Sequence, residues 1–276
     1  MVVQHNLTAM NASRNLGITT SAQAKQTEKL SSGYRINRAA DDAAGLSISE
    51  KMRRQIRGLT QASTNAQDGI SMVQTAEGAL NEVTDMLQRM NELTVKASNG
   101  TYTTTQKAYV SDEINQLTSE INRVATTTRF NDQVLLTGGF SSTAMTLQIG
   151  NENGETMDVT IDAMYATDIA TELTGSIDWS DSSNDPTDLI DAIKSGLENV
   201  ASQRSALGAI QNRLEHTINN LDNVVENTTS AESRVRDTDM AKEMVSYSNN
   251  QILAQAGQAM LAQANQVNQG VLSLLQ

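Results

Sequence analysis

The sequence predicts a mainly α-helical protein, built as an elongated helical bundle or coiled-coil rod with a small β-hairpin in the middle of the chain. Three observations support this fold class. Proline occurs once in 276 residues, at Pro186, so almost nothing interrupts a long helix. Aromatic residues make up only 3% of the chain, which leaves few bulky anchors for a globular core. Apolar residues recur with the period of a coiled-coil seam in three long segments.

The first long helix is predicted over residues 43–98. Its apolar or small residues recur in steps of three or four, with an average of 3.5 residues per step, which is the period of a coiled-coil seam. At the usual rise per residue this helix is ~84 Å long, a length that suits a rod. The seam consists of Ile48, Met52, Ile56, Leu59, Ala62, Ala66, Ile70, Val73, Ala76, Leu80, Val83, Leu87 and Met90.

The stretch LSSGYRINRAADDAAG, residues 30–45, precedes this helix and has the composition of either a phosphate or metal site or a joint between helices. Asp41 and Asp42 stand just before the seam, where a carboxylate caps free N–H groups at a helix start. Gly33 and Gly45 permit bends or close packing. We therefore interpret the stretch as a helix-start joint.

Two further seams follow. The turn-forming SNGTYTTTQ, residues 98–106, separates the first helix from a second one with apolar residues between Val110 and Val124. The third seam runs from Ile193 to Val225 and has one polar member, Arg204. None of these helices can bury its apolar stripe alone, so we expect the three to pack as a bundle.

The middle of the chain has a different pattern. Residues 138–185 are rich in Gly, Ser, Thr and Asp, and residues 145–161 alternate in polarity around an Asn-Glu-Asn-Gly turn. This alternation predicts a β-hairpin. Residues 174–186 are polar and are expected to form a loop that ends at Pro186.

Two segments lack charged side chains, residues 1–13 and residues 244–276. A solvated helix normally carries charge on its outer face, so uncharged helices are expected to be enclosed. No other part of the chain is left to enclose them, and we therefore expect other copies of the same chain to cover their apolar residues. The expected packing residues are Leu7, Met10, Leu253, Met260, Ala264, Val267, Val271 and Leu274.

Composition excludes several functions. A net charge of −12 argues against nucleic-acid binding, which needs clustered Lys and Arg. No apolar run approaches the length of a membrane span, and the first 30 residues lack the apolar core of a cleavable signal. His5 and His216 have no metal-spaced partners, cysteine is absent, and no catalytic motif occurs. We expect no enzyme activity, no cofactor and no metal.

Several long motifs resemble those of bacterial flagellins, in a minimal form without large outer domains. In the first half these are LSSGYRINRAADDAAGLSIS, GLTQASTNAQDGISMVQTAEGALNEV, MLQRMNELTVKASNGT and RFNDQVLL. In the second half they are QRSALGAIQNRLEHTINNL, SAESRVRDTDMAKEM and ILAQAGQAMLAQANQVNQGVLSLLQ.

The resemblance implies a domain organisation in which the N- and C-terminal helices pair to line the core of a filament. The inner segments of this family are disordered in the monomer and fold on assembly. The implied domains are an N-terminal inner-core helix and joint (1–42), the N-terminal part of the rod (43–137), a variable β-hairpin and loop region (138–185), the C-terminal helix of the rod (186–235) and a C-terminal inner-core helix (236–276).

The resemblance also implies a recognition surface. In flagellins the QRxxEL stretch and the following helix are recognised by Toll-like receptor 5 and also make contacts between subunits. The matching residues here are Gln88, Arg89, Glu92, Leu93 and Glu113. Taken by itself, the pattern predicts an exposed Arg–Glu contact worth about 0–1 kcal/mol.

The implied function is self-assembly into the extracellular flagellar filament, after secretion by the flagellar type III export apparatus. The implied partners are other flagellin copies, a filament cap protein, hook–filament junction proteins, an export chaperone at the C-terminal helix and Toll-like receptor 5. A hook–filament junction protein and a secreted coiled-coil effector or adhesin are the alternatives.

Overall fold

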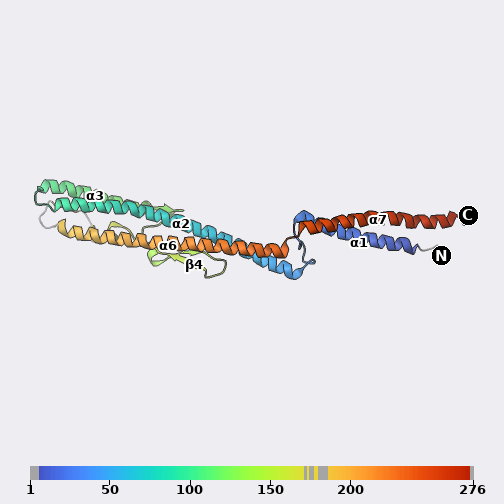
Figure 1. Ribbon diagram of the computed structural model, residues 1–276. Helices are drawn as coiled ribbons and strands as arrows, with labels where there is room; N and C mark the ends of the chain where they lie inside the picture. Colours follow the sequence, from blue (N-terminus) through green and yellow to red (C-terminus); the bar gives the residue numbers. More distant parts are fainter. Residues whose placement is uncertain (1–5, 171–172, 174–176, 180–185, 274–276) are drawn as a thin grey trace. The chain divides into compact units, whose positions relative to one another are not determined.

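The computed structural model describes residues 6–170, 173, 177–179 and 186–273 (Figure 1). Within these residues it has seven α-helices and two antiparallel strand pairs, which confirms the predicted mainly α class with a small β-hairpin. The elements are α1 (Leu7–Ser32), α2 (Ala43–Ala97), α3 (Thr104–Thr127), β1 (Arg129–Phe130), β2 (Gln133–Val134), α4 (Gly139–Ser142), β3 (Met145–Gln148), β4 (Thr156–Val159), α5 (Ala166–Ile169), α6 (Pro186–Arg236) and α7 (Met240–Ser273).

The chain divides into two compact units. Residues 1–56 and 226–276 form one, which we call the terminal unit, and residues 57–225 form the other, the central unit. The long helices α2 and α6 contribute residues to both.

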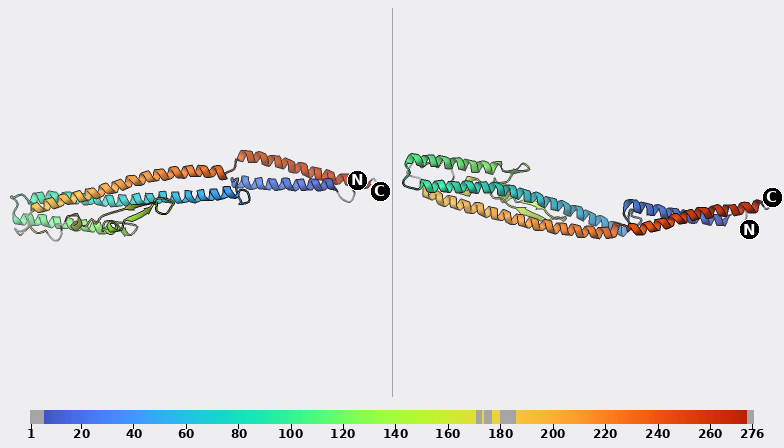
Figure 2. Two further views of the ribbon diagram at one scale, coloured as in Figure 1. Left: turned by 90° about the horizontal axis from the view of Figure 1, so that it is seen from below. Right: turned by 45° about the horizontal axis from the view of Figure 1, so that its top comes forward.

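The central unit is a bundle in which α2, α3 and α6 lie side by side (Figures 1 and 2). The predicted seams supply its core, because Leu80 and Leu87 of α2, Ile114 of α3 and Leu207 and Leu214 of α6 are all fully buried. This confirms that the three periodic segments bury their stripes against one another.

The buried stripe of α2 begins later and ends later along the chain than the sequence predicted. Ile48 is 47% exposed, so the predicted start of the seam is wrong, and the buried core residues of α2 begin at Leu59. At the other end the stripe continues past Met90 to Leu93 and Ala97, both buried. The spacing of three and then four residues after Met90 keeps these two on the same helix face.

The polar member of the third seam, Arg204, forms an ion pair with α2. Its Nη2 atom lies 3.3 Å from Oε1 of Glu77, and the two side chains are 31% and 45% exposed. A pair that is this accessible contributes about 0–1 kcal/mol. Its main effect is to let a charged residue occupy a seam position without burial of an unpaired charge.

The predicted hairpin is present as β3 and β4, which pair antiparallel with Leu147 opposite Met157. It lies close against α2 because α2 carries glycines where the hairpin approaches. A Cβ atom at Gly69 would lie 2.5 Å from Cδ1 of Leu147, and one at Gly58 would lie 1.9 Å from Oδ1 of Asn151. Between these glycines, Nδ2 of Asn65 donates a hydrogen bond to the carbonyl oxygen of Gln148 at 3.0 Å.

A second strand pair, β1 with β2, lies in a segment that the sequence analysis assigned to the helical rod. Its turn residues Asn131 and Asp132 have φ angles of 48° and 63°. Asn and Asp tolerate this left-handed region, and two such residues in succession form the turn that matches strand twist. The Asn-Asp pair in RFNDQV was therefore an available hairpin signal that was missed.

The predicted loop at residues 174–186 is only partly described, since residues 174–176 and 180–185 lie outside the described residues. Trp179, the one tryptophan of the chain, is 5% exposed and belongs to the core of the central unit. Asn115 of α3 fixes the preceding backbone, because its Oδ1 accepts from the N–H of Ile177 at 2.9 Å and its Nδ2 donates to the carbonyl of Ile177 at 3.0 Å.

In the terminal unit α1 lies alongside α7, which confirms the expected pairing of the two terminal helices (Figure 2). Polar groups set the register of the pair. Nδ2 of Asn6 donates to the carbonyl oxygen of Ala264 at 2.9 Å, and Nδ2 of Asn250 donates to Oε1 of Gln26 at 2.8 Å. Helix α1 has no buried residue, so pairing two helices leaves its apolar side chains accessible.

The joint before α2 is organised by its two aspartates. Oδ1 of Asp42 accepts a hydrogen bond from the N–H of Gly45 at 2.8 Å, in the first turn of α2. Oδ2 of Asp41 accepts from the N–H groups of Arg38 at 2.9 Å and Asn37 at 3.2 Å. Asp42 thus caps the helix, whereas Asp41 fixes the preceding turn.

The hydrogen bond from the N–H of Arg38 lowers the pKa of Asp41 most, and the one from the N–H of Asn37 lowers it further. Because folding lowers the pKa of Asp41, its carboxylate stabilises the folded state at pH values above the unfolded pKa of about 3.9. This stabilisation is lost as the pH falls through the folded pKa.

The same region connects the ends of α1 and α6. Helix α1 ends at Gly33, whose φ of 74° is readily adopted only without a side chain. The carbonyl oxygen of Gly33 accepts from the N–H of Thr238 at 3.0 Å. The guanidinium of Arg236 lies 4.5 Å from the ring centroid of Tyr34, and its Nη1 lies 3.2 Å from Oε1 of Glu50. The joint is thus a cluster of cap, cation–π and ion-pair contacts.

Two glycines of α6 give opposite predictions for replacement by alanine. A Cβ atom at Gly196 would lie 2.7 Å from Cγ2 of Ile169, a buried residue of α5, whereas one at Gly208 would have no atom within 4 Å. We expect Gly196→Ala to lower the free energy of unfolding by about 1–3 kcal/mol. We expect Gly208→Ala to raise it by about 0.5–1 kcal/mol through helix propensity. Urea titration followed by Trp179 fluorescence measures both, and equal shifts of the same sign would contradict this packing.

Removal of the cap is expected to destabilise the start of α2. Asp42→Ala leaves the N–H of Gly45 without its acceptor, at a cost of about 0.5–2 kcal/mol, whereas Asp42→Ser restores an acceptor. Hydrogen–deuterium exchange of peptides covering residues 43–47 should show roughly fivefold less protection in the alanine variant. Unchanged protection in Asp42→Ala would show that the hydrogen bond does not hold this turn.

Candidate assembly and recognition surfaces

Large apolar side chains are exposed on both helices of the terminal unit. Leu7 and Met10 of α1 and Leu253 and Met260 of α7 are each more than half exposed. No charged residue follows Glu243, so this surface has no ionic group along most of α7. We call it the terminal apolar surface; its described members are Leu7, Met10, Ile18, Val245, Ile252, Leu253 and Met260.

The other predicted packing residues of α7 differ in position or in what the structure describes. Ala264 is 9% exposed and adjoins the α1 contact through its carbonyl oxygen, which Asn6 binds. Val267 and Val271 lie within α7, but their side chains are outside the described part of the structure, as is all of Leu274. Sequence reasoning did not select Ile18, Val245 or Ile252, although their apolar character in polar surroundings was an available signal.

A charged cluster bridges α2 and α3 in the central unit. Nη2 and Nε of Arg89 lie 2.9 and 3.1 Å from Oε1 of Glu113, and Nη1 lies 3.3 Å from Oε2 of Glu92. The hydrogen bonds that Arg89 donates to Glu113, and secondly to Glu92, raise the pKa of Arg89. Gln88 is exposed beside this cluster. We call Gln88, Arg89, Glu92 and Glu113 the charged surface.

Leu93 does not belong to the charged surface. It was expected there as the i+4 neighbour of Arg89, but it is only 2% exposed and packs in the core of the central unit. Its place one turn after Met90 in the seam explains the difference. Its side chain packs in the core beneath the segment of α2 that carries the charged surface.

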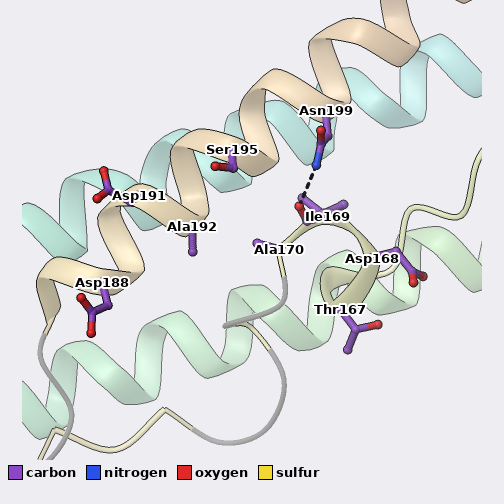
Figure 3. A pocket seen from close by; sticks show the side chains of 9 residues that line it. All are labelled: Thr167, Asp168, Ile169, Ala170, Asp188, Asp191, Ala192, Ser195 and Asn199. Atoms are coloured by element: carbon purple, nitrogen blue, oxygen red, sulfur yellow. Dashed lines mark hydrogen bonds between the residues drawn. The ribbon is translucent and has the colours of Figure 1, made fainter.

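A cavity of about 600 Å³ lies in the central unit beside α5 and α6 (Figure 3). Nδ2 of Asn199 donates to the carbonyl oxygen of Ile169 at 3.2 Å across it. Its described lining has three carboxylates and no histidine, cysteine, lysine or arginine. It is lined by Thr167, Asp168, Ile169, Ala170, Asp188, Asp191, Ala192, Ser195 and Asn199.

The described residues contain neither a metal-binding cluster nor a membrane-spanning helix. Among the described residues, no group of three or more His, Cys, Asp or Glu side chains is arranged to hold a metal ion. In the same part of the chain, no helix combines the length and apolar character that crossing a membrane requires. Two exposed surfaces of the described residues are candidates for interaction, the terminal apolar surface and the charged surface.

Comparison with protein families gives two matches that together span most of the chain. Residues 3–141 match the bacterial flagellin N-terminal helical region, and residues 190–275 match the bacterial flagellin C-terminal helical region. The stretch between them contains the β3–β4 hairpin and α5.

Individual relatives match over the full length of both chains. The chain is 54% identical over 275 residues to a flagellin of Halalkalibacterium halodurans and 48% identical over 303 residues to a flagellin of Bacillus subtilis. It is 49% identical over 289 residues to the flagellar filament 31.3 kDa core protein of Treponema maltophilum. Each alignment covers 100% of this chain and 100% of the relative.

Two solved structures of flagellar proteins are similar to this chain. The crystal structure of Bacillus cereus flagellin is similar with a TM-score of 0.50 and 26% identity, covering 57% of this chain and 88% of that one. A putative flagellar hook-associated protein from Vibrio parahaemolyticus has a TM-score of 0.59 at 15% identity, covering 71% and 100% of the two chains, which shows a shared fold alone. The chain belongs to the bacterial flagellin family and is a structural subunit of the flagellar filament, not an enzyme.

Proposed function

We propose that this flagellin polymerises by burying its terminal apolar surface against the same surface region of neighbouring copies. The observation that carries the proposal is the combination of exposed Leu, Ile, Val and Met side chains with the absence of charge after Glu243. A charge-free helix can be enclosed by other helices without desolvating ions, whereas a charged one cannot.

The energetics favour a polymer over an isolated subunit with this surface exposed. Complete burial of one Leu, Ile or Met side chain contributes about 1.5–3 kcal/mol. The terminal apolar surface carries seven such side chains of Leu, Met, Ile or Val, and burial of their exposed parts between copies favours association. Repeated contacts between different faces of identical subunits do not close on themselves, and they therefore generate a helical polymer.

We propose further partners for the same surface at the ends of the polymer and before assembly. A filament cap protein and hook–filament junction proteins continue the stack at the two ends of the polymer. The fold shared with a putative hook-associated protein supports such contacts. An export chaperone covers α7 before assembly, and the type III export apparatus delivers the chain to the outside of the cell. The full-length match to filament flagellins favours the filament subunit over the junction protein.

A single exposed leucine tests the assembly proposal. Leu253 is 56% exposed, so Leu253→Gln is expected to leave the folded subunit unchanged while it weakens each contact between subunits. We expect seeded elongation, followed by electron microscopy, to slow by at least about tenfold, which corresponds to the loss of ~1.4 kcal/mol per contact. The control Leu253→Met keeps the apolar volume and should elongate normally. Equal elongation of both variants would contradict the proposal.

We also propose that the charged surface binds Toll-like receptor 5 and contributes to contacts between subunits. Arg89 is supported by two carboxylates from two helices, which holds its guanidinium in one place. Arginine in a fixed, planar arrangement is a frequent energetic centre of protein interfaces. The buried Leu93 beneath it keeps this part of α2 rigid.

Alanine variants of this ion pair test the receptor proposal. We expect Arg89→Ala and Glu113→Ala to weaken receptor affinity by at least about tenfold, while each lowers stability by no more than ~1 kcal/mol. The matched control is Arg123→Ala, which removes a similarly exposed arginine from its ion pair with Glu120 on α3. Surface plasmon resonance with monomeric protein is the measurement. Unchanged affinity in the first two variants would exclude this surface as the receptor contact.

A further inference from the structure

The most exposed and the most buried methionines of the described residues lie in different units, and Met52, Met86 and Met145 are intermediate. Those with the most exposed side chains all lie on α1 or α7 in the terminal unit: Met10 (64%), Met240 (48%), Met244 (51%) and Met260 (62%). The buried methionines among the described residues all lie in the central unit and are at most 5% exposed: Met72, Met90, Met157 and Met164.

Two of the exposed methionines lie at the same level of the α1–α7 pair. Asn6 binds the carbonyl of Ala264, and a Cβ atom at Gly257 would lie 3.3 Å from Cδ1 of Leu16. Met10 lies between Asn6 and Leu16, and Met260 lies between Gly257 and Ala264. Both therefore belong to one section of the terminal apolar surface, whereas Met240 and Met244 lie at the start of α7.

We propose that Met10 and Met260 are oxidation sites at which peroxide reversibly blocks subunit assembly. The inference rests on the proposed assembly through the terminal apolar surface. Thioether accessibility makes these two side chains reactive in the free subunit, and burial between subunits makes them unreactive in the filament.

The chemistry needs only hydrogen peroxide as oxidant. The thioether sulfur attacks one peroxide oxygen, the O–O bond breaks and an S=O bond forms. Sulfur is oxidised by two electrons, and the second oxygen leaves as water with both peroxide hydrogens. The sulfoxide is polar and accepts strong hydrogen bonds, so its burial in an apolar contact is unfavourable. A thiol-dependent methionine sulfoxide reductase reverses the reaction.

Peptide mapping by mass spectrometry tests the site assignment on the full chain. After brief treatment of free subunits with dilute hydrogen peroxide, we expect Met10 and Met260 to be oxidised at least tenfold faster than Met72 and Met90. In assembled filaments under the same treatment, we expect oxidation of Met10 and Met260 to slow by at least tenfold. Equal rates in subunits and filaments would overturn the inference.

Seeded elongation tests the consequence. We expect oxidised subunits to elongate at least tenfold more slowly than untreated ones and to regain their rate after treatment with the reductase. Each variant is compared with its own rate before treatment: the double variant Met10→Leu/Met260→Leu should keep that rate after peroxide, whereas the control Met240→Leu/Met244→Leu should lose at least tenfold of its own, as the unsubstituted protein does. Normal elongation of oxidised unsubstituted protein would overturn the inference alone. Failure of untreated protein to elongate would overturn the proposed assembly, and with it this inference.

Discussion

The structure depends on one constraint, which is that a long helix with an apolar stripe is stable only when other helices cover that stripe. The central unit meets the constraint within one chain, since α2, α3 and α6 bury each other's seams around Leu80, Ile114 and Leu207. In the terminal unit α1 pairs with α7, and α1 contains no buried residue. One chain therefore contains a unit whose helices cover one another's apolar stripes and a unit whose apolar side chains stay exposed. The exposed side chains of the second unit support polymerisation.

Most of the helical architecture could be predicted from the sequence because periodicity is a direct record of which face is buried. The seams located α2, α3 and α6, and the alternating pattern around Asn-Glu-Asn-Gly located β3 and β4. The errors arose where tertiary packing decides. Ile48 fits the seam period but is exposed, and Leu93 looked like a surface residue although it continues the buried stripe. The β1–β2 pair was missed because two-residue strands carry almost no periodic signal.

The candidate surfaces were predictable to different degrees. The absence of charge after Glu243 is a property of composition, and it identified α7 directly. The charged surface needed both the QRxxEL motif and the antiparallel packing of α2 and α3, which places Arg89 2.9 Å from Glu113. No spacing rule could have shown that Arg236 stacks on Tyr34, because these residues lie at opposite ends of the chain. Long-range contacts of this kind require the fold.

The β3–β4 hairpin contacts α2 at two glycines, with the strand residue Leu147 against Gly69 and the turn residue Asn151 against Gly58. The turn residues Glu152 and Asn153 are exposed. A peptide spliced between them would extend outward from a loop that is already solvated. It would interrupt the hydrogen bond from the N–H of Glu155 to the carbonyl oxygen of Glu152, while the strand ladder and the contact of Leu147 with Gly69 stay in place. This turn is therefore a natural position for displaying foreign epitopes in large numbers along a filament.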